Sequence, residues 1–202
     1  MENVIAISGT PGTGKSAVAS LLADQLNTET IELSQVVKDQ RFHYGEDPDR
    51  GTLIANLEKL QEHLVGRFRD TKKLFVVIGH FADLVPEYHM KVLVVLRCHP
   101  VTLTERLRNR QWPLKKTLEN IQAEILGECT YQGLAHHNRS KIFEIDTTNS
   151  TIEQVVLIIK KILAGKGNEY TVGKISWLSV LDPHLIHEIM EENKLPSSSQ
   201  KA

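Results

Sequence analysis

Eight residues near the N-terminus, Gly9–Ser16, carry the clearest chemistry in this chain. They read GTPGTGKS and match the phosphate-binding pattern GxxxxGK(S/T) at every fixed position. The glycines of such a loop let the backbone turn sharply and present bare N–H groups to an anion. Lys15 can reach the outer phosphates of a nucleotide, and Ser16 can supply a hydroxyl ligand for Mg²⁺. The pattern predicts a nucleotide site; the alternative is a chance glycine turn before a helix.

The segments before and after this loop have the patterns of a strand and a helix, the two elements that a phosphate-binding loop connects. Residues 4–8, VIAIS, are apolar and mostly β-branched, which is typical of a buried strand. Residues 17–26 are rich in good helix formers. A helix that begins at the end of the loop adds its partial positive N-terminus to the anion site. The backbone groups that we expect to cradle the phosphates belong to Gly12, Gly14 and Ala17.

A basic run at residues 105–116, ERLRNRQWPLKK, is the second chemical candidate. It lies at a connection between helices, because Pro113 cannot continue a helix. Arginines on a mobile connection can close over a nucleotide and neutralise charge during phosphoryl transfer. A solvated basic helix end explains the run equally well. The small size of the chain and the lack of an NKxD-type guanine motif favour a small-molecule kinase over a motor or a switch GTPase.

Four other polar residues each have two explanations. His80 follows a buried strand, so it either positions a water or phosphate or is a satisfied structural histidine. Asp146 follows the last strand and is either a nucleotide contact or a helix N-cap. His136 and His137 stand at a helix end. Exposure to solvent is favoured over metal binding for this pair, because no set of further ligands lies nearby.

The composition is ordinary for a globular protein. The chain has 202 residues, of which 41% are hydrophobic and 24% charged, and its formal net charge is −1. A charge near zero argues against a large nucleic-acid-binding face. No signal peptide and no segment apolar and long enough to cross a membrane is evident. Cys98 and Cys129 lack metal-like spacing, so we expect free thiols in a reducing, cytoplasmic environment.

Strands and helices alternate along the chain, which predicts a three-layer α/β/α fold around a parallel sheet. The ligand site of such a sheet lies at the carboxyl ends of its strands, where the glycine loop falls. The expected strands are 4–8, 30–33, 74–78, 91–97 and 142–146. The expected helices are 17–26, 34–39 with Ser34 as N-cap, 56–68, 102–110, 118–134 and 151–163.

The connections and the C-terminal stretch are less regular. Residues 44–51 are rich in turn formers and are expected to be a polar loop, and residues 81–90 a connection with one helical turn. After residue 164 the composition becomes linker-like. We expect a domain over 1–164, followed over 165–202 by a linker, one short helix within 180–193 and a disordered tail from residue 196.

Several of these motifs together resemble the adenylate kinase isoenzyme 6 family, small nuclear and archaeal proteins of the P-loop nucleoside monophosphate kinase type. The resemblance covers about residues 1–163. The segment NIQAEI at 120–125 is fairly specific to that family, whereas the glycine loop is not. The other shared segments are Tyr44–Asp47, Gly79–His80, Pro86–Glu87, Val95–Arg97, Glu105–Leu107, Arg110 and Lys115–Lys116.

The resemblance implies that separate segments of the chain would bind ATP, bind the monophosphate and form a lid. The glycine loop would bind ATP, with Mg²⁺ on Ser16. Residues 30–53 would bind the monophosphate, with Lys38 and Tyr44 as contacts, and residues 110–118 would form a short lid. Arg110 would contact the phosphates, and Asp146 would lie beside the adenine. Lys15, His80 and Arg110 would be the catalytic residues.

The chain departs from the family pattern at two positions. Ile78 stands where the family places an acidic residue that holds the Mg²⁺ water shell, so the metal would rely on Ser16, the phosphates and a carboxylate such as Asp83. Lys38 stands where the family has arginine, and lysine lacks the bidentate fork. The two departures predict a slow or altered phosphotransferase.

Two functions follow from the sequence. The first is adenylate kinase-like transfer of the γ-phosphoryl group of Mg·ATP to a nucleoside monophosphate, with associated ATPase activity. The second, which the family resemblance implies, is an ATP-hydrolysing assembly factor in small ribosomal subunit and rRNA maturation. It would grip a platform ribosomal protein, in the cytoplasm or, in a eukaryote, also the nucleus. Neither function requires direct nucleic-acid or membrane binding.

Overall fold

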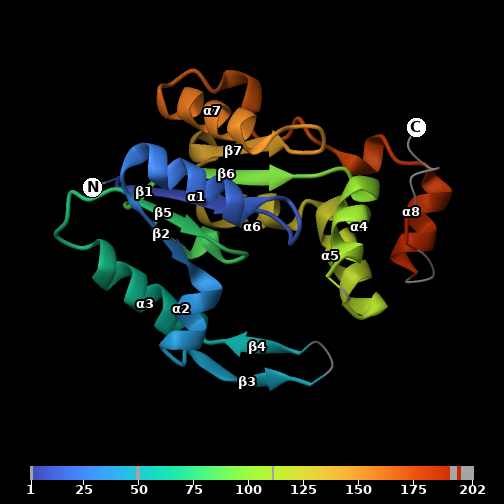
Figure 1. Ribbon diagram of the computed structural model, residues 1–202, viewed down its shortest axis with the longest axis horizontal. Helices are drawn as coiled ribbons and strands as arrows, with labels where there is room; N and C mark the ends of the chain where they lie inside the picture. The colour runs from blue at the N-terminus through green and yellow to red at the C-terminus, as the bar shows by residue number, and fades with distance from the viewer. Residues whose placement is uncertain (1, 49–50, 111, 192–194, 197–202) are drawn as a thin grey trace.

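A central sheet with helices on both faces forms the body of the molecule (Figure 1). This computed structural model describes residues 2–48, 51–110, 112–191 and 195–196. The main sheet has five strands in the order β2-β5-β1-β6-β7, and all of its pairs are parallel. The predicted parallel α/β fold is therefore confirmed. The strands are β1 (Val4–Ser8), β2 (Glu29–Glu32), β5 (Phe75–Ile78), β6 (Met90–Arg97) and β7 (Ile142–Asp146).

The strand order places the glycine loop at the point where the sheet changes direction. β1 lies between β5 and β6. The chain leaves β1 for the strands on one side and later crosses to β6 and β7 on the other. Loops at such a switch point leave a crevice at the carboxyl ends of the strands, where ligands bind in α/β proteins. All five side chains of β1 are buried, which explains why its sequence is continuously apolar.

Helices cover the two faces of the sheet. On one face, α1 and α7 bury side chains such as Leu22 and Ile159 against the strands. On the other face, α2, α3 and α6 pack through side chains such as Leu33, Leu64 and Cys129. These helices are α1 (Lys15–Leu26), α2 (Leu33–Asp39), α3 (Leu57–Phe68), α6 (Glu128–His136) and α7 (Ile152–Leu163).

A third apolar cluster lies beyond the carboxyl ends of the strands. It joins α4 (Pro100–Arg108), α5 (Leu114–Leu126) and α8 (Pro183–Met190), at the right of Figure 1. Leu103 and Leu107 of α4 lie so close to Gly12 that a Cβ atom there would come within 2.8 Å of the Leu103 side chain. The cluster therefore fixes α4 directly against the glycine loop.

Two expected elements differ from those observed. Residues 44–51 are not a simple loop, because β3 (His43–Asp47) and β4 (Thr52–Ala55) form an antiparallel hairpin. Its strands are short and largely exposed, so they lack the apolar alternation that marks a strand. The expected helix over 118–134 is two helices, α5 and α6. Gly127 adopts a left-handed conformation, φ 68°, and ends α5.

Smaller differences concern helix ends. Ser34 is not an N-cap; it lies inside α2, and Glu32 occupies the cap position. Asn56 caps α3 by accepting from the Lys59 N–H. The expected turn within residues 81–90 is confirmed as the 3₁₀ helix η1 (Ala82–Leu84). None of the helices within the described residues has the length and apolar character that spanning a bilayer requires.

The described part of the C-terminal stretch packs against the domain. Gly167 lies against Phe143 and Ile162, and Thr171 forms a β-bridge with Phe143. The expected short helix is α8, capped by the Asp182 carboxylate. The division at residue 164 stays a prediction. Residues 197–202, most of the expected disordered tail, lie outside the described residues.

The glycine at the break between α5 and α6 gives a test of this architecture. Gly127→Ala places a Cβ on a left-handed residue, which costs roughly 1–2 kcal/mol. Gly66→Ala is the matched control, because Gly66 lies inside α3 with open space around it, and alanine there should stabilise by about 0.5–1 kcal/mol. Urea denaturation of both variants checks the opposite signs. Equal free energies of unfolding for Gly127→Ala and the native chain would contradict the assignment of this break.

Candidate nucleotide site

The glycine loop runs from the buried end of β1 to the first turn of α1. Gly9, φ 137°, packs so tightly that any Cβ would collide with the backbone oxygen of Leu96 in β6. Gly14, φ 97°, is the N-cap residue of α1 in a left-handed conformation that suits glycine. The first N–H groups of α1 have no partner within the helix. Ser16 and Ala17 are exposed at this end, so the helix presents its N-terminus to the solvent side, as predicted.

Lys15 lies over the loop. Its Nζ donates hydrogen bonds to the carbonyl oxygens of Gly9, at 2.6 Å, and Thr10, at 3.0 Å. Burial lowers the pKa of Lys15 to about 8, and the positive charge of Arg110 also acts in this direction. The charges of Cys129, Glu124 and Glu32 oppose the shift. The ammonium group is thus held where phosphates would meet the loop, and a bound anion would restore its full charge.

A small cavity of about 230 Å³ adjoins the loop. Arg106 spans it: the guanidinium donates to the backbone oxygens of Thr147, at 2.8 Å, and Thr148, at 3.2 Å. A longer bond, 3.4 Å, reaches the Gly12 oxygen. The cavity has the place expected of a nucleoside, beside the phosphates. It is lined by Gly12, Thr13, Gly14, Ala17, Val18, Arg106, Thr147, Ser150, Thr151, Ile152 and Val155.

Arg106 is the residue that sequence reasoning left out of the site. It is half-buried on α4, one helical turn before Arg110. α4 ends at Arg108, so Arg106 lies on the helix and Arg110 follows it. The position of Arg106 inside the basic run was the available signal.

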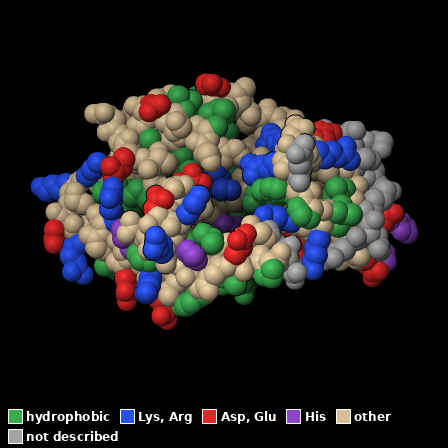
Figure 2. Space-filling view, turned by 60° about the horizontal axis from the view of Figure 1, so that its bottom comes forward, with side chains coloured by type: hydrophobic (Ala, Val, Ile, Leu, Met, Phe, Trp, Pro, Cys, Tyr) green, Lys and Arg blue, Asp and Glu red, His purple; other side chains and the backbone are tan. Residues whose placement is uncertain are grey.

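Arg110 lies at the predicted lid. It is exposed just after α4, and its guanidinium carbon stands 5.0 Å from the centre of the Trp112 ring. Lys116 lies over the same ring at 4.8 Å. The charge of Arg110 acts on Lys15 and contributes to the lowered pKa of that side chain. Gln111, inside the predicted lid, lies outside the described residues. Figure 2 shows lysine and arginine side chains around the hollow near the middle of this face.

His80 follows β5 on the other side of the loop. Its Nδ1 lies 3.6 Å from the Cys129 Sγ. His80 as a residue is exposed, but desolvation of the ring by its neighbours and the charge of Lys15 lower its pKa below the usual value, against the opposing charges of Asp83 and Glu128. The imidazole is therefore neutral at pH 7 and able to accept a proton. The charge of Lys15 acts on His80, and the charge of Arg110 acts on Lys15; the catalytic roles of these three residues stay a prediction.

The carboxyl end of β5 is apolar. Ile78 is 3% exposed and belongs to the cluster beneath α1. The nearby Asp83 is buried and already paired, because its Oδ2 lies 2.8 Å from the His136 Nδ1. Within the described residues, no group of three or more metal-ligating side chains forms a site. Ser16 is thus the one predicted metal ligand that lies free at the loop.

The two neighbouring histidines differ. His136 is largely exposed, as expected of the pair. His137 is instead buried: its Nδ1 lies 2.7 Å from the Glu87 Oε2, and its Nε2 lies 2.7 Å from the Asp83 backbone oxygen. The expectation of an exposed pair is therefore wrong for His137, whose role is to join α6 to the segment before β6.

The remaining predicted residues lie at the edges of the site. Asp146 is not the cap of α7, because Thr151 takes that place in a capping box. The Asp146 carboxylate accepts from the Thr148 N–H at 2.8 Å and so shapes the turn beside the nucleoside cavity. Lys38 is exposed on α2, and Tyr44 is 71% exposed on β3. Their elements form the arm that projects below the sheet in Figure 1.

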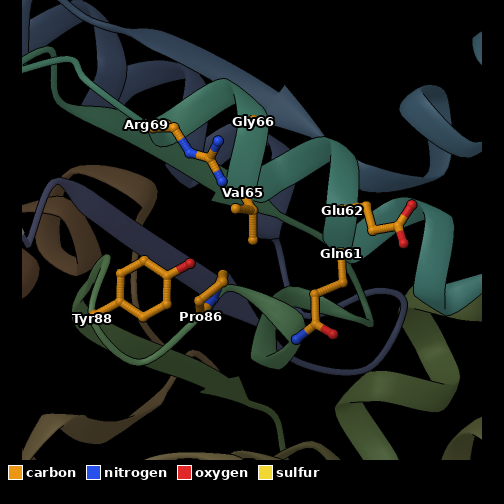
Figure 3. A pocket seen from close by; sticks show the side chains of 7 residues that line it. All are labelled: Gln61, Glu62, Val65, Gly66, Arg69, Pro86 and Tyr88. Atoms are coloured by element: carbon orange, nitrogen blue, oxygen red, sulfur yellow. The ribbon is translucent and has the colours of Figure 1, made fainter.

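A larger hollow of about 500 Å³ is a poor candidate for the nucleotide (Figure 3). It lies between α3 and the segment that precedes β6, at the amino ends of the strands. In parallel α/β sheets the ligand sites lie at the opposite edge. This hollow also lacks a glycine loop. It is lined by Gln61, Glu62, Val65, Gly66, Arg69, Pro86 and Tyr88.

Comparison with known proteins agrees with this geometry. The model of an AAA domain family matches residues 5–127, which include the glycine loop. The protein named "Putative adenylate kinase" from Methanocaldococcus jannaschii is 36% identical over 186 residues, or 92% of this chain and 98% of that protein. A protein of the same name from Methanothermobacter thermautotrophicus is 37% identical over 162 residues, or 80% and 90% of the two chains.

Solved structures share the fold at lower identity. Shikimate kinase from Bacteroides thetaiotaomicron superposes with a TM-score of 0.55 at 19% identity and covers 80% of this chain and 98% of that chain. Shikimate kinase from Acinetobacter baumannii, in complex with shikimate, has the same TM-score at 17% identity, with 82% and 95% covered. The loop, the sheet order and these comparisons lead to one conclusion: the chain belongs to the AAA-domain family, and it is a homologue of the archaeal proteins named "Putative adenylate kinase".

Proposed function

We propose that this protein transfers the γ-phosphoryl group of Mg·ATP to a nucleoside monophosphate, with AMP as the first acceptor to test. The observation that carries the proposal is the glycine loop itself: Lys15 is hydrogen-bonded to its carbonyl oxygens, and a cavity of about 230 Å³, lined by Arg106, adjoins it. The α2–hairpin arm with Lys38 and Tyr44 supplies a place for the acceptor. The names of the archaeal relatives support the same reaction.

Catalysis would consist of positioning and electrostatics. The N–H groups at the start of α1 would bind phosphate oxygens, and Lys15 would offset charge on the β- and γ-phosphates. Arg110 would move over the γ-phosphate and stabilise the charge of the transferring group. No general base is required, because a monophosphate oxygen is already an anionic nucleophile. The bond from the γ-phosphorus to the β–γ bridging oxygen breaks as the acceptor oxygen bonds to the phosphorus, which yields two diphosphates from ATP and AMP.

Mg²⁺ fits this site through Ser16. The Ser16 hydroxyl stands exposed at the first turn of α1, beside the phosphate positions. Ser16 would help to hold the ion, whose charge would offset part of the charge of the phosphates. Ile78 offers no oxygen, and Asp83 is held by His136, so the chain itself supplies few further contacts. Lys15 and the lid arginine would therefore carry a larger share of the phosphate charge.

A second candidate function is ATP hydrolysis, which the position of His80 favours. The neutral imidazole stands beside Lys15, where it could orient an attacking water. Hydrolysis would then drive an assembly step, for which the family resemblance suggests a ribosomal protein of the small subunit as the partner. In that case AMP would be a poor acceptor.

An activity panel separates the two reactions. ADP formation that requires both ATP and AMP supports the kinase, whereas phosphate release independent of AMP supports the hydrolase. Lys15→Ala should lower either activity by about 10²–10³-fold, because it removes the charge over the phosphates. Lys59→Ala on the exposed face of α3 is the matched control and should retain native activity. If Lys15→Ala kept both activities, both proposals would fail.

The apolar residue at the end of β5 gives a second test. Ile78→Asp introduces a carboxylate beside the start of α1, so we expect turnover at limiting Mg²⁺ to rise several-fold. Ile78→Asn carries a side chain of the same shape without the charge and should not raise it. Initial rates across a Mg²⁺ titration provide the measurement. Unchanged Mg²⁺ dependence in Ile78→Asp would count against this account of the metal site.

The lowered pKa of Lys15 predicts proton uptake when ATP binds. With a pKa of about 8, about half of the Lys15 side chains are neutral at pH 8. An anion favours the charged form and raises that pKa, so binding takes up protons at pH 8 and weakens as the pH rises further. The pKa of His80 is itself lowered by desolvation and by the charge of Lys15, so His80 is not the group expected to take up this proton.

Calorimetry in two buffers of different ionisation enthalpy measures this uptake. Lys15→Arg keeps a charge that does not titrate, so its binding should take up no proton at pH 8. Equal proton uptake by the native chain and Lys15→Arg would mean that another group titrates.

A further inference from the structure

One buried carboxylate, Glu124 of α5, connects the glycine loop to the C-terminal stretch. Its side chain is 2% exposed. The Oε2 atom accepts from the Thr10 hydroxyl at 2.6 Å. The Oε1 atom accepts from the Trp177 indole N–H at 2.8 Å, the Arg97 Nε at 2.8 Å and the Cys98 N–H at 3.1 Å. Three segments distant in sequence, at residues 10, 97–98 and 177, thus meet on one side chain.

Thr10 is the residue that connects this network to the phosphate-binding loop. Its side chain points to Glu124, while its backbone oxygen accepts from Lys15 Nζ, at 3.0 Å, and from the Thr13 hydroxyl, at 2.9 Å. Thr10 is 1% exposed. The carboxylate of Glu124 therefore fixes the residue whose carbonyl orients both Lys15 and Thr13 in the loop.

The C-terminal stretch reaches the same network at one further point, Gly173, and a neighbouring bond from Arg139 holds Val172. The Gly173 N–H donates to the Glu144 Oε2 at 2.7 Å, and Arg139 donates to the Val172 oxygen at 2.8 Å. Glu144 and Glu124 share Arg97, whose Nη1 lies 2.5 Å from the Glu144 Oε1. Trp177 also packs at the edge of Arg97, 5.9 Å from its guanidinium carbon. Residues 172–177 are thus hydrogen-bonded to Glu144 and Glu124, and Glu124 in turn binds the glycine loop through Thr10.

The network contains two carboxylates and one guanidinium, so its net charge is negative and favours a cation on the side of the loop. Two buried carboxylates share one guanidinium, and together they raise the pKa of Arg97 above its usual value against the effect of burial. The charge of Glu124 also favours the protonated form of Lys15. A network needed for packing alone could use apolar residues of similar volume, often without loss of stability. A network that positions the Lys15 ammonium and the glycine loop, in contrast, requires the negative charge of the Glu124 carboxylate.

We propose that Glu124 is a positioning residue for the ATP phosphate loop, and that Trp177 makes the C-terminal stretch part of that site's support. The proposal rests on the proposed nucleotide binding, but not on the identity of the phosphate acceptor. It assigns a role in ATP binding to residues after 164, a stretch that forms no part of the nucleotide-binding unit predicted from the sequence.

Thr10→Val tests the first half of the proposal. It keeps the shape of threonine but removes the hydroxyl and leaves the Glu124 Oε2 without that donor. A hydrogen bond to a charged group is worth about 1.5–3 kcal/mol, so the Kd for ATP should rise by at least about tenfold. Thr10→Ser keeps the hydroxyl and should restore most of the affinity. Calorimetry with Mg·ATP alone gives the Kd, independent of any acceptor.

A matched control separates positioning from stability. Thr28 stands at the far end of α1, and its hydroxyl also donates to a backbone oxygen, that of Leu74. Thr28→Val should lower the melting temperature without changing the Kd for ATP. A native Kd for Thr10→Val, or an equal loss of affinity in Thr28→Val, would overturn the role of Glu124.

Trp177 tests the second half. Trp177→Phe keeps an aromatic ring but removes the N–H donor to Glu124, and we expect the Kd for ATP to rise several-fold. In the Trp112→Phe background, Trp177 is the only tryptophan, so its fluorescence should change when ATP is added. A native Kd for Trp177→Phe together with fluorescence that does not respond to ATP would show that the C-terminal stretch is independent of the site.

The outcomes also distinguish this proposal from the proposed function. If the native chain binds ATP but transfers no phosphoryl group to any monophosphate, the kinase proposal fails, while the Thr10 and Trp177 variants still decide the role of the network. If the kinase activity is present and the variants bind ATP as the native chain does, only the positioning proposal fails.

Discussion

The backbone N–H groups at the start of α1 have no partners inside the helix, and the site depends on keeping them available to an anion. The loop before them must turn sharply without satisfying those groups itself. Gly9 and Gly14 make the turn sterically allowed. Packing then holds it: Leu103 and Leu107 of α4 press against Gly12, and the Thr10 side chain is anchored to Glu124. The loop is thus fixed by its surroundings in addition to its own hydrogen bonds, which run from Lys15 and Thr13 to its carbonyl oxygens.

The same anchoring explains why α4 and α5 stand at the carboxyl end of the sheet. α4 brings Arg106 to the backbone around Thr147 and leaves Arg110 beside Lys15. α5 brings Glu124 beneath the loop. Because the two helices share one apolar cluster with Trp177 and α8, the lid and the loop rest on a common support. A displacement of that support would alter phosphate binding and lid placement together.

Much of this arrangement could be predicted from the sequence, because the main signals are local. The pattern GTPGTGKS and the apolar runs of the strands depend on near neighbours, and they indicated the loop, the parallel sheet and the position of the site. The β3–β4 hairpin was missed, since its short exposed strands carry no apolar alternation. The break at Gly127 was missed because one glycine inside a helical pattern does not specify whether the helix continues.

The contacts of Glu124 that hold the loop could not be predicted from the sequence, for a different reason. Glu124 lies 114 residues from Thr10 and 53 from Trp177, and no periodicity relates positions so far apart. Its segment could be identified only as one that resembles a family, without a role for the acid. Burial reveals that role: a carboxylate removed from water must be paired, and its partners show what it holds.

The balance of fixed charges at the proposed phosphate site affects which of two reactions it would favour, transfer to a monophosphate or hydrolysis. At the end of β5, Ile78 gives the metal no carboxylate, so the fixed charges around the phosphates are mainly cations, those of Lys15, Arg106 and Arg110. Cations stabilise the phosphoryl group during transfer to either a monophosphate or a water. The choice between these acceptors therefore depends on how well the α2–hairpin arm places a monophosphate against the γ-phosphate. If the arm binds a monophosphate as proposed, Lys38 would provide a point charge there without a fork, and orientation of the acceptor would depend on the rest of the arm.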